Sequence, residues 1–468
     1  MNTSTDLQQL PKVLLRKFTD ILGEHHFLTS KADCLAYSFD NSKLQSIPLA
    51  VAFPTDAGQV QQIVRLCHDN QIPLTARGRG TGTTGATVPI HGGIVVSFEK
   101  MNHILEIDTA NRLARVEPGV INQTLQDELA KVGFFWPPDP TSAANCTIGG
   151  NLAYNSAGPR AVKYGTPRDN TLGLTAITGN GELFKTGVTT TKGVVGYDLT
   201  RLLIGSEGTL GLITEATLKI VPLAEAKKTM QAGFADINHA AQAVSAIMSQ
   251  PLIPCSLEIM DQAAIEMVRD FSDLGLTDNI NAILMIVVDG PANTLNESVQ
   301  AIKKACSNAG LVDFQIADSA ESVERLWKTR KALSPALRKI APQKINEDVV
   351  VPVSRIPELI AGLQIISARH QIPIVNFGHA GNGNLHVNLL THPDNPIHQA
   401  NKTACLDDVF KLVLELDGTL SGEHGIGLVK RDYVGLEIDQ TALNLMRAIK
   451  RQFDPHGILN AGKSLPQD

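Results

Sequence analysis

Hydrophobic residues near the N-terminus follow first a helical and then an extended spacing. Five apolar residues between positions 9 and 43 recur on one helix face and predict a helical segment: Leu10, Val13, Leu14, Phe18 and Leu22. Residues 47–54 then predict a strand, the helical spacing of Val60, Ile63, Val64 and Cys67 predicts a helix, and residues 72–76 predict a second strand. This order is typical of a βαβ unit.

The spacing changes again further along the chain. Extended runs separated by Gly, Asn and Asp predict a β-rich region, at 94–98, 113–120, 172–183 and 215–222. Later, strands at 230–236, 255–261, 282–290 and 312–318 alternate with helices at 237–249, 260–271 and 293–309. This alternation predicts a ferredoxin-like plan, a sheet covered by helices on one face. Helices at 320–340 and 354–370, strands at 372–380 and 384–390, and a mostly helical last quarter complete the prediction.

These changes of spacing divide the chain into three parts and give an α+β fold class. We expect an N-terminal helical segment at 1–44 that packs on the next domain, a first domain at 45–223 and a second at 224–468. The sequence shows no short-period repeat and no low-complexity linker, so the boundary near 222–226 depends on the change of spacing alone.

Composition narrows the class of protein. The 468 residues are 43% hydrophobic and 19% charged with a net charge of -6, as in ordinary soluble globular proteins. No basic run suggests nucleic acid or an anionic membrane as a partner. The longest apolar run, 282–288, has the length of a strand and is too short to span a bilayer. The six cysteines form no CxxC pair, and the N-terminus lacks a secretory signal, so we expect a cytoplasmic protein. A peripheral association with the inner membrane stays open.

The glycine-rich stretch RGRGTGTTGATVPIHGG, residues 77–93, contains the pattern GxGxxG. In a nicotinamide-binding Rossmann domain this pattern joins a strand to a helix. Here Pro89 and the pair Gly92–Gly93 prevent a helix, and a β-branched run follows. We therefore expect a strand-to-strand loop whose backbone N–H groups hold a pyrophosphate, since glycine permits close approach.

Two further stretches extend this pattern, PPDPTSAANCTIGGNLAYNSAGPRAVKYGTPRDN at 137–170 and GSEGTLGLITEATLKI at 205–220. With them, from about Pro48 to the C-terminal FDPHGILNAGKSL, the chain resembles flavoproteins with a vanillyl-alcohol-oxidase-type FAD domain. It is most similar to FAD-linked 2-hydroxy-acid dehydrogenases, which include D-lactate dehydrogenase, D-2-hydroxyglutarate dehydrogenase and the glycolate oxidase flavin subunit. The resemblance implies an FAD domain, a ferredoxin-like substrate domain and a C-terminal helical segment.

The resemblance also implies the residues that line FAD: Arg77, Gly78, Gly80, Thr81, Gly82, Thr83, Thr84, Gly85, Pro138, Asp139, Thr141, Gly149, Gly150, Asn151, Asn155, Ser156, Gly158, Tyr164, Gly165, Glu207, Gly208, Ile213 and Asn460. Small side chains here leave room for a flat ring system. Some relatives tether FAD through a histidine in the first loop. That loop has threonines here and no histidine, so we expect non-covalent FAD.

A second group of residues, NFGHAGNGNLHVNLL at 376–390 and SGEHGIGLVKRDY at 421–433, points to a metal. His379 and His386 bracket a Gly/Asn turn, and Glu423 adds an oxygen ligand. Two imidazoles and one carboxylate leave coordination positions open, as in catalytic sites. The resemblance makes these three the ligands, His424 the acid–base residue and Asn388 a substrate-binding residue. Zinc is the first choice, with manganese and iron as alternatives.

These groups suit the oxidation of a 2-hydroxy acid. A divalent cation stabilises the forming alkoxide, His424 accepts the hydroxyl proton, and the flavin accepts the hydride at N5. The family also places an arginine, a hydroxyl and a lysine that bind substrate carboxylates. These correspond to Arg330, Ser334 and Lys344, although Lys344 aligns only with a one-residue gap.

The sequence thus predicts an FAD-dependent, metal-assisted dehydrogenase of D-2-hydroxyglutarate or D-lactate. Recognition of a distal carboxylate by Arg330 and Lys344 would favour D-2-hydroxyglutarate. The alternative is a glycolate oxidase-type flavin subunit that needs partner subunits. The acceptor of the flavin's electrons stays open among an electron-transfer flavoprotein, a quinone and a cytochrome, and a homodimer is a reasonable oligomer.

Overall fold

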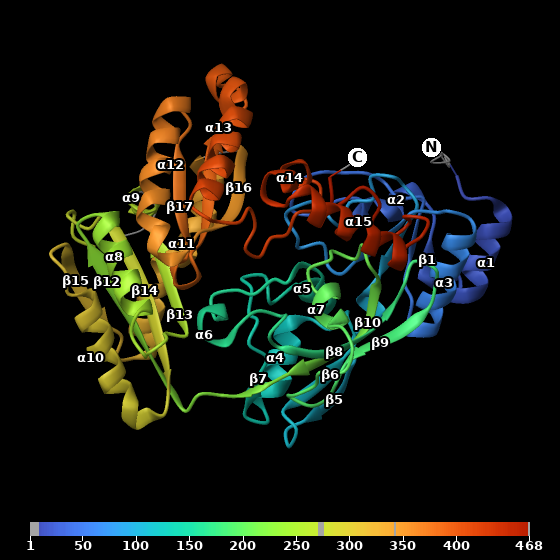
Figure 1. Cartoon of the computed structure of the whole chain (residues 1–468), viewed down its shortest axis with the longest axis horizontal. Coiled ribbons are helices and arrows are strands. Elements are labelled where there is room, and N and C mark those ends of the chain that lie inside the picture. The colour runs from blue at the N-terminus through green and yellow to red at the C-terminus, as the bar shows by residue number, and fades with distance from the viewer. Residues whose placement is uncertain (1–8, 270–275, 341–342, 467–468) are drawn as a thin grey trace. The chain divides into compact units, whose positions relative to one another are not determined.

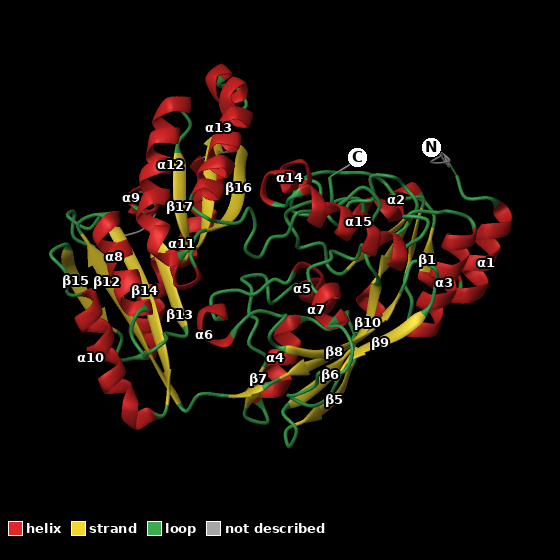
Figure 2. Ribbon diagram, in the orientation of Figure 1, coloured by secondary structure: helices red, strands yellow, loops and turns green. Residues whose placement is uncertain are grey.

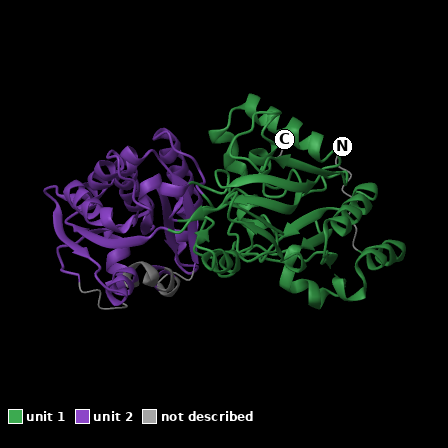
Figure 3. Ribbon diagram, turned by 90° about the horizontal axis from the view of Figure 1, so that it is seen from below, with its two compact units in different colours: residues 1–158, 165–223, 423–468 green, residues 159–164, 224–422 purple. Residues whose placement is uncertain are grey.

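A computed structural model describes residues 9–269, 276–340 and 343–466, without the side chains of 328–332, 334–335 and 338–340. The chain forms two compact units (Figure 3). Unit 1 comprises residues 1–158, 165–223 and 423–468, and unit 2 comprises 159–164 and 224–422. The predicted first domain therefore lies in unit 1 except for 159–164. The predicted second domain is divided, because 423–468 belongs with unit 1.

Unit 1 begins with a four-stranded sheet of order β1-β2-β4-β3, in which β4 lies parallel to both β2 and β3. Its elements are α1 Lys12–Leu22, β1 Phe27–Leu28, α2 Lys31–Cys34, β2 Ala50–Ala52, α3 Ala57–Asp69, β3 Leu74–Arg77 and β4 Ile94–Ser97. Figure 1 labels β1 of this sheet and the helices α1 and α3. The predicted βαβ unit is confirmed, since the apolar face of α3 is fully buried. The prediction that Val13 lies on the buried face of α1 is wrong. Val13 is 68% exposed, because the buried stripe of α1 runs through Leu14, Phe18 and Leu22.

A second, antiparallel sheet of order β5-β6-β10-β8-β9 holds a further hydrophobic core of unit 1. The elements of this region are β5 Ile104–Asp108, β6 Leu113–Val116, α4 Asn122–Ala130, β7 Phe134–Phe135, α5 Ile148–Tyr154, β8 Thr171–Ile177, β9 Leu183–Gly187, α7 Leu199–Leu203, β10 Leu212–Lys219 and β11 Val221–Pro222. Trp136 is fully buried in this core and donates from its indole nitrogen to Asn170 O at 3.0 Å. The predicted β-rich region is confirmed.

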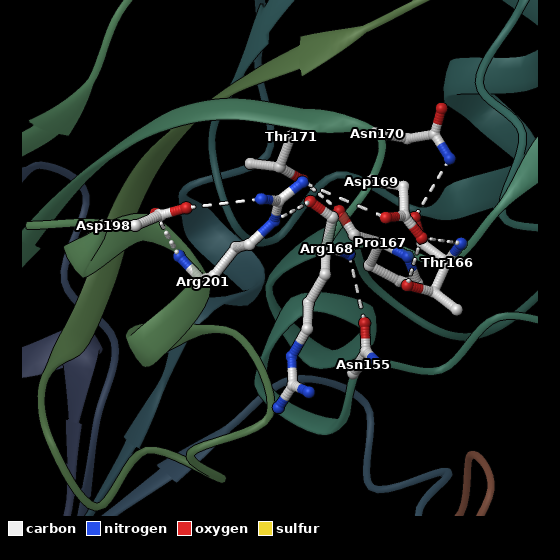
Figure 4. A network of polar contacts seen from close by, with 9 residues as sticks. All are labelled: Asn155, Thr166, Pro167, Arg168, Asp169, Asn170, Thr171, Asp198 and Arg201. Atoms are coloured by element: carbon white, nitrogen blue, oxygen red, sulfur yellow. Dashed lines mark hydrogen bonds and ion pairs between the residues drawn. The ribbon is translucent and has the colours of Figure 1, made fainter. Parts of the chain in front are cut away.

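Polar contacts hold the loop at 165–171, which leads into β8, in place (Figure 4). Arg168 N donates to Asn155 Oδ1 at 3.1 Å, and Thr166 N donates to Asp169 Oδ2 at 2.9 Å. Arg201 lies between two carboxylates, 3.5 Å from Asp198 and 4.0 Å from Asp169. The loop is thereby fixed on both sides by side chains of unit 1.

The C-terminal segment of unit 1 returns to the first sheet. It contains α14 Val434–Glu437 and α15 Gln440–Phe453, and then Leu459 forms a parallel bridge with Leu74 of β3. Asp454 is buried and accepts the N–H groups of Ile458 and Leu459, at 3.0 and 2.8 Å. Ile458 and Leu459 are therefore built into the first sheet's core.

Unit 2 is built on a seven-stranded antiparallel sheet of order β15-β12-β14-β13-β17-β18-β16. Its strands are β12 Ala226–Phe234, β13 Ser256–Met260, β14 Ala282–Gly290, β15 Leu311–Ile316, β16 Gln343–Val350, β17 Ile374–His379 and β18 Asn384–Thr391. Its helices are α6 Ala161–Tyr164, α8 Ile237–Met248, α9 Gln262–Arg269, α10 Leu295–Cys306, α11 Ala320–Ile340, α12 Ile356–His370 and α13 Pro396–Glu415.

Helices cover both faces of this sheet, not one as predicted (Figure 2). Ile283 and Met285 of β14 pack in one core with α9 and α11, whereas α8 and α10 contact β12 and β14. All residues of β14 from Ala282 to Val288 are buried. A strand buried on both faces has a continuous hydrophobic sequence, so the unbroken apolar run 282–288 was a signal of a second helical layer that the prediction did not use.

Two further expectations concern the chain as a whole. All six cysteines are unpaired and buried, in agreement with the absence of a CxxC pair. Within the described ranges, no helix combines the length and apolar character that a membrane crossing requires.

Candidate active site

Unit 1 contains a cavity whose lining residues come from segments that lie far apart in the sequence. Its walls are mostly small or apolar: Ala76, Arg77, Gly78, Ala86, Thr87, Phe98, Pro118, Thr147, Gly149, Gly150, Ala153, Tyr154, Ser206, Glu207, Gly208, Gly211, Leu212, Ile213 and Asn460. Eight of the residues predicted to bind FAD are among them: Arg77, Gly78, Gly149, Gly150, Glu207, Gly208, Ile213 and Asn460. The structure thus brings together residues from both ends of unit 1.

Glycine is required at two of these walls. A Cβ on Gly78 would lie 2.3 Å from Thr147 Oγ1, and one on Gly149 would lie 2.6 Å from Pro118 Cβ. Contacts below 3.0 Å force a neighbour to move, so any other residue would push into the surroundings of the cavity. Backbone without side chains lets a flat, extended ligand lie directly against the chain. The residues present therefore fit a dinucleotide with a flat ring system.

The predicted pyrophosphate loop is held from two sides. The Arg77 guanidinium donates to Phe39 O at 2.8 Å, so this side chain fastens residues 36–39. Thr84 O accepts from Leu428 N at 2.8 Å, and a Cβ on Gly427 would come within 2.3 Å of the same oxygen. The prediction of a strand-to-strand loop is confirmed, because β4 follows without an intervening helix.

Sequence reasoning missed several walls of the cavity, among them Phe98, Pro118, Thr147 and Tyr154. Thr147 had a usable signal, since a threonine before an apolar helical run is a typical N-cap. Its hydroxyl accepts from Gly150 N at 3.2 Å at the start of α5. Phe98 and Tyr154 had none, because a lone aromatic residue next to a strand or helix end is usually a core residue.

The other residues predicted to line FAD lie outside the cavity's wall, and several have structural contacts. Asn151 Oδ1 accepts from Asn122 at 3.0 Å, and Asn155 accepts from Arg168. Tyr164 belongs to unit 2, where its hydroxyl donates to Asp289 at 2.7 Å. FAD contacts by the remaining residues stay predictions: Gly80, Thr81, Gly82, Thr83, Thr84, Gly85, Pro138, Asp139, Thr141, Ser156, Gly158 and Gly165.

Glu207 links the cavity to residues 425–427. Its carboxylate is buried and accepts the N–H groups of Ile426 and Gly427, at 2.6 and 2.8 Å. Burial raises the pKa of Glu207, while its hydrogen bonds with Ser464 and these N–H groups oppose the shift. Burial also lowers the pKa of Lys463 to about 7, partly offset by the charges of Glu207 and Asp40. A buried carboxylate and a buried amine therefore lie beside the cavity.

His424 lies in this same segment of unit 1. Thr84 Oγ1 donates to His424 O at 3.4 Å, and a Cβ on Gly425 would meet Glu207 Oε1 at 2.2 Å. The predicted acid–base residue therefore directly precedes Gly425, and Gly425 packs against two residues of the cavity wall, Glu207 and Tyr154.

The two predicted metal-binding histidines meet in a hairpin of unit 2. His379 ends β17, residues 380–383 form the predicted Gly/Asn turn, and His386 is the third residue of β18. Their ring centroids are 5.3 Å apart, and the residues are 5% and 7% exposed. His379 Nδ1 lies 2.5 Å from Oε1 of Glu258, which is 2% exposed. Two imidazoles held this close in a buried layer can bind one metal ion.

Glu423, the third predicted ligand, is the first residue after Gly422, where unit 2 ends. Asp348 of β16 is fully buried and fixes the preceding residues, accepting Ser421 Oγ at 3.1 Å and Gly422 N at 2.8 Å. Glu423 itself counts with unit 1, where its Oε2 accepts from Gly158 N at 2.8 Å and its backbone oxygen from Ser156 at 3.2 Å.

Of the four predicted substrate-binding residues, the structure describes the side chains of two, Asn388 and Lys344. Asn388 is fully buried, donates to Val375 O and His386 O, and accepts from Asn346 at 2.7 Å. Lys344 lies in β16 opposite Leu390. Arg330 and Ser334 lie on α11, and their side chains are outside the described residues. The role of all four in substrate binding stays a prediction.

A glycine-lined cavity for a flat dinucleotide beside a histidine-bearing segment is characteristic of flavin-dependent oxidoreductases. The chain belongs to the FAD-linked oxidases. Residues 48–187 match the family model of an FAD binding domain, and residues 223–464 match that of the FAD linked oxidases' C-terminal domain. The protein is therefore an FAD-linked oxidoreductase of the 2-hydroxy acid type.

Three relatives show the range of this family. The chain is 38% identical to glycolate oxidase subunit GlcD of Bacillus subtilis, with 98% of each chain covered. It is 34% identical to a D-lactate dehydrogenase of Anaerostipes hadrus, over 89% of each chain. It is 32% identical to a D-2-hydroxyglutarate dehydrogenase of Stutzerimonas stutzeri, over 93% of this chain and 95% of the relative.

Solved structures support the fold. The chain matches p-cresol methylhydroxylase with a TM-score of 0.78 at 18% identity, over 97% of each chain. It matches 4-ethylphenol oxidase from Gulosibacter chungangensis with a TM-score of 0.76 at 20% identity, with the same coverage. The predicted vanillyl-alcohol-oxidase-type fold is confirmed.

Proposed function

We propose that this protein catalyses the FAD-dependent, divalent-metal-assisted oxidation of a D-2-hydroxy acid, D-2-hydroxyglutarate or D-lactate, to the 2-oxo acid. The observation that carries the proposal is the position of His424. It lies in a segment that Glu207 fixes at the wall of the cofactor cavity, and it directly follows the candidate ligand Glu423. A proton acceptor, a cofactor cavity and a metal ligand thus share one short stretch of chain.

The residues divide the chemistry among them. The cavity walls of unit 1 would hold FAD, and His379, His386 and Glu423 would hold the cation through two imidazoles and a carboxylate. When bound, FAD accepts a hydride and the cation lowers the cost of ionising the substrate hydroxyl. His424 would take the hydroxyl proton, since a positioned imidazole is the most common general base in enzymes. Zinc fits this donor set, and manganese and iron fit it too.

Substrate recognition is assigned to the positions that the family resemblance indicates. Arg330 clamps a carboxylate through two parallel hydrogen bonds, and Ser334 and Lys344 add further donors. Asn388 supports this region from within the sheet, since its amide ties β18 to β17 and β16. A distal carboxylate bound by Arg330 and Lys344 would favour D-2-hydroxyglutarate over D-lactate.

A substrate panel with the purified chain and an artificial electron acceptor tests the proposal. We expect turnover with D-2-hydroxyglutarate or D-lactate, little with the L-acids, and loss of turnover after treatment with a chelator. Absence of turnover with every D-2-hydroxy acid tested, in protein that contains FAD, would refute the proposal.

A second candidate is a glycolate oxidase-type flavin subunit that needs partner subunits. The 38% identity to the GlcD subunit over nearly the whole chain favours it. The presence of the two histidines, Glu423 and His424 in one chain favours an enzyme that acts alone. Size-exclusion chromatography combined with the assay separates the two, because the second candidate requires that the isolated chain be inactive with glycolate and the D-acids.

A further inference from the structure

We propose that Glu258 is a positioning residue for the metal, which selects the nitrogen through which His379 binds the ion. The inference rests on the metal site of the proposed function and adds a residue outside the predicted ligand set. Glu258 is the third residue of β13, and His379 is the last residue of β17, the strand paired with β13. Their contact joins Oε1 of Glu258 to Nδ1 of His379 at 2.5 Å.

This geometry determines what His379 can offer to an ion. A carboxylate oxygen at Nδ1 requires the proton on that nitrogen, so Nε2 is the nitrogen that can bind a metal. The same contact fixes the plane of the ring. A carboxylate acceptor also makes the imidazole a stronger ligand than a neutral acceptor would. Glu258 therefore controls both the direction and the strength of this ligand.

The surroundings argue against a purely stabilising ion pair. Glu258 is 2% exposed, and the two residues on its face of β13, Ser256 and Met260, are 6% and 0% exposed, so the carboxylate lies on a buried face of the sheet. A buried ion pair of this kind contributes little net stability compared with apolar residues of similar size. A role in orienting His379 as a metal ligand explains why an acid stands at this buried position.

Asp261 provides a matched control three residues further along. It too is a buried acid that faces β17, but its carboxylate accepts from Asn376, through N at 3.0 Å and Nδ2 at 2.9 Å, and not from a histidine. It also caps α9, accepting from Ala264 N at 2.8 Å. Replacement of Asp261 disturbs the same pair of strands and leaves His379 alone.

The test compares zinc affinity in four full-length, FAD-loaded proteins by competition with a chromogenic chelator. The variants are Glu258→Leu, Glu258→Gln and Asp261→Asn, beside the wild type. We expect Glu258→Leu to weaken zinc binding about 10- to 100-fold, the effect typical of residues that orient metal ligands. Glu258→Gln keeps a hydrogen-bond acceptor and should lose only a few-fold. Asp261→Asn should stay within about twofold of the wild type.

A spectroscopic measurement accompanies the affinities. Cobalt replaces zinc, and its visible absorption bands report the ligand field around the ion. We expect these bands to shift in Glu258→Gln, so the proposal remains testable if Glu258→Leu does not fold. A role in stability alone would lower the melting temperature and move neither readout.

The outcomes separate this inference from the proposed function. A wild type that binds no divalent metal refutes the metal site itself and the inference with it. A wild type that binds one zinc ion, together with a Glu258→Leu or Glu258→Gln variant of unchanged affinity and unchanged cobalt spectrum, refutes the role of Glu258 alone.

Discussion

The cofactor cavity of unit 1 and the β17–β18 hairpin of unit 2 are built on opposite principles. The cavity is shaped by residues that lack side chains, because Gly78 and Gly149 let the backbone pack directly against Thr147 and Pro118 in the wall. The hairpin is shaped by polar side chains held in a buried layer, where His379 and Asn388 have carboxylate and backbone partners. The first site should fail when a methyl group is added, and the second when a polar group is removed.

The largest expected effect is a loss of turnover on replacement of His424, the residue assigned to proton transfer and not to binding. His424→Ala should lower turnover by about two to four orders of magnitude, the usual contribution of a general base, while FAD content stays unchanged. Steady-state kinetics and the flavin absorbance of the purified variant measure both. His103→Ala is the control, since that side chain is 71% exposed and its ring nitrogen lies 2.8 Å from Glu117 Oε2, just after β6 of unit 1. A tenfold loss or less in His424→Ala would remove His424 from its assigned role.

The second effect tests the claim that the cavity depends on missing side chains. Gly149→Ala places a Cβ 2.6 Å from Pro118, and overpacking of this kind costs about 1 to 3 kcal/mol. We expect FAD affinity to fall about tenfold or more, measured by fluorescence titration of the apoprotein. Gly435→Ala serves as the control, because a Cβ there meets no atom within 4 Å. Equal FAD affinity in both variants would contradict the close-approach argument.

The third prediction concerns the amine buried beside the cavity. Because burial lowers the pKa of Lys463 to about 7, the unfolded chain binds a proton that the folded chain lacks between this value and the ordinary lysine pKa near 10.4. The free energy of unfolding should therefore rise with pH from about 7 to 10, by up to about 1.4 kcal/mol per pH unit.

Urea denaturation at pH 7.5 and 8.5 measures this slope, and Lys463→Met should reduce it. The wild type and the variant differ in one titrating group, so the difference between their slopes isolates Lys463. Identical slopes would mean that this amine keeps its ordinary pKa in the folded protein.

The smallest effect lies in the loop network around Arg201. Its carboxylate partners are 53% and 54% exposed, and exposed ion pairs contribute at most about 1 kcal/mol. Arg201→Ala should lower the free energy of unfolding by less than that and leave FAD content unchanged. Loss of the flavin in this variant would show that the loop at 165–171 controls the cavity more strongly than its contacts indicate.

The same contrast explains how much the sequence could predict. Glycines and short polar residues form a visible pattern, so many walls of the cavity and the absence of a Rossmann helix were predictable. Phe98, Pro118 and Tyr154 were not, because their approach to the cavity depends on how distant segments pack. The histidine hairpin was predictable from its turn residues. Glu258 was not, since the pairing of β13 with β17 joins residues 121 positions apart.

The position of 423–468 was the least accessible feature. A change of spacing near 222 marks where one body ends, but nothing in the local pattern shows that the last segment returns to the first. The contacts responsible are long-range: Leu459 with β3, and Glu207 with residues 426–427. This return brings His424 to the cofactor cavity.

The account is tested most directly by rapid anaerobic mixing of the FAD-loaded chain with D-2-hydroxyglutarate or D-lactate, while the visible flavin absorbance is followed. The metal-loaded protein should be bleached in a single turnover, the chelator-treated protein should be bleached far more slowly, and zinc or manganese should restore the rate. Bleaching at the same rate with and without the metal would contradict the account.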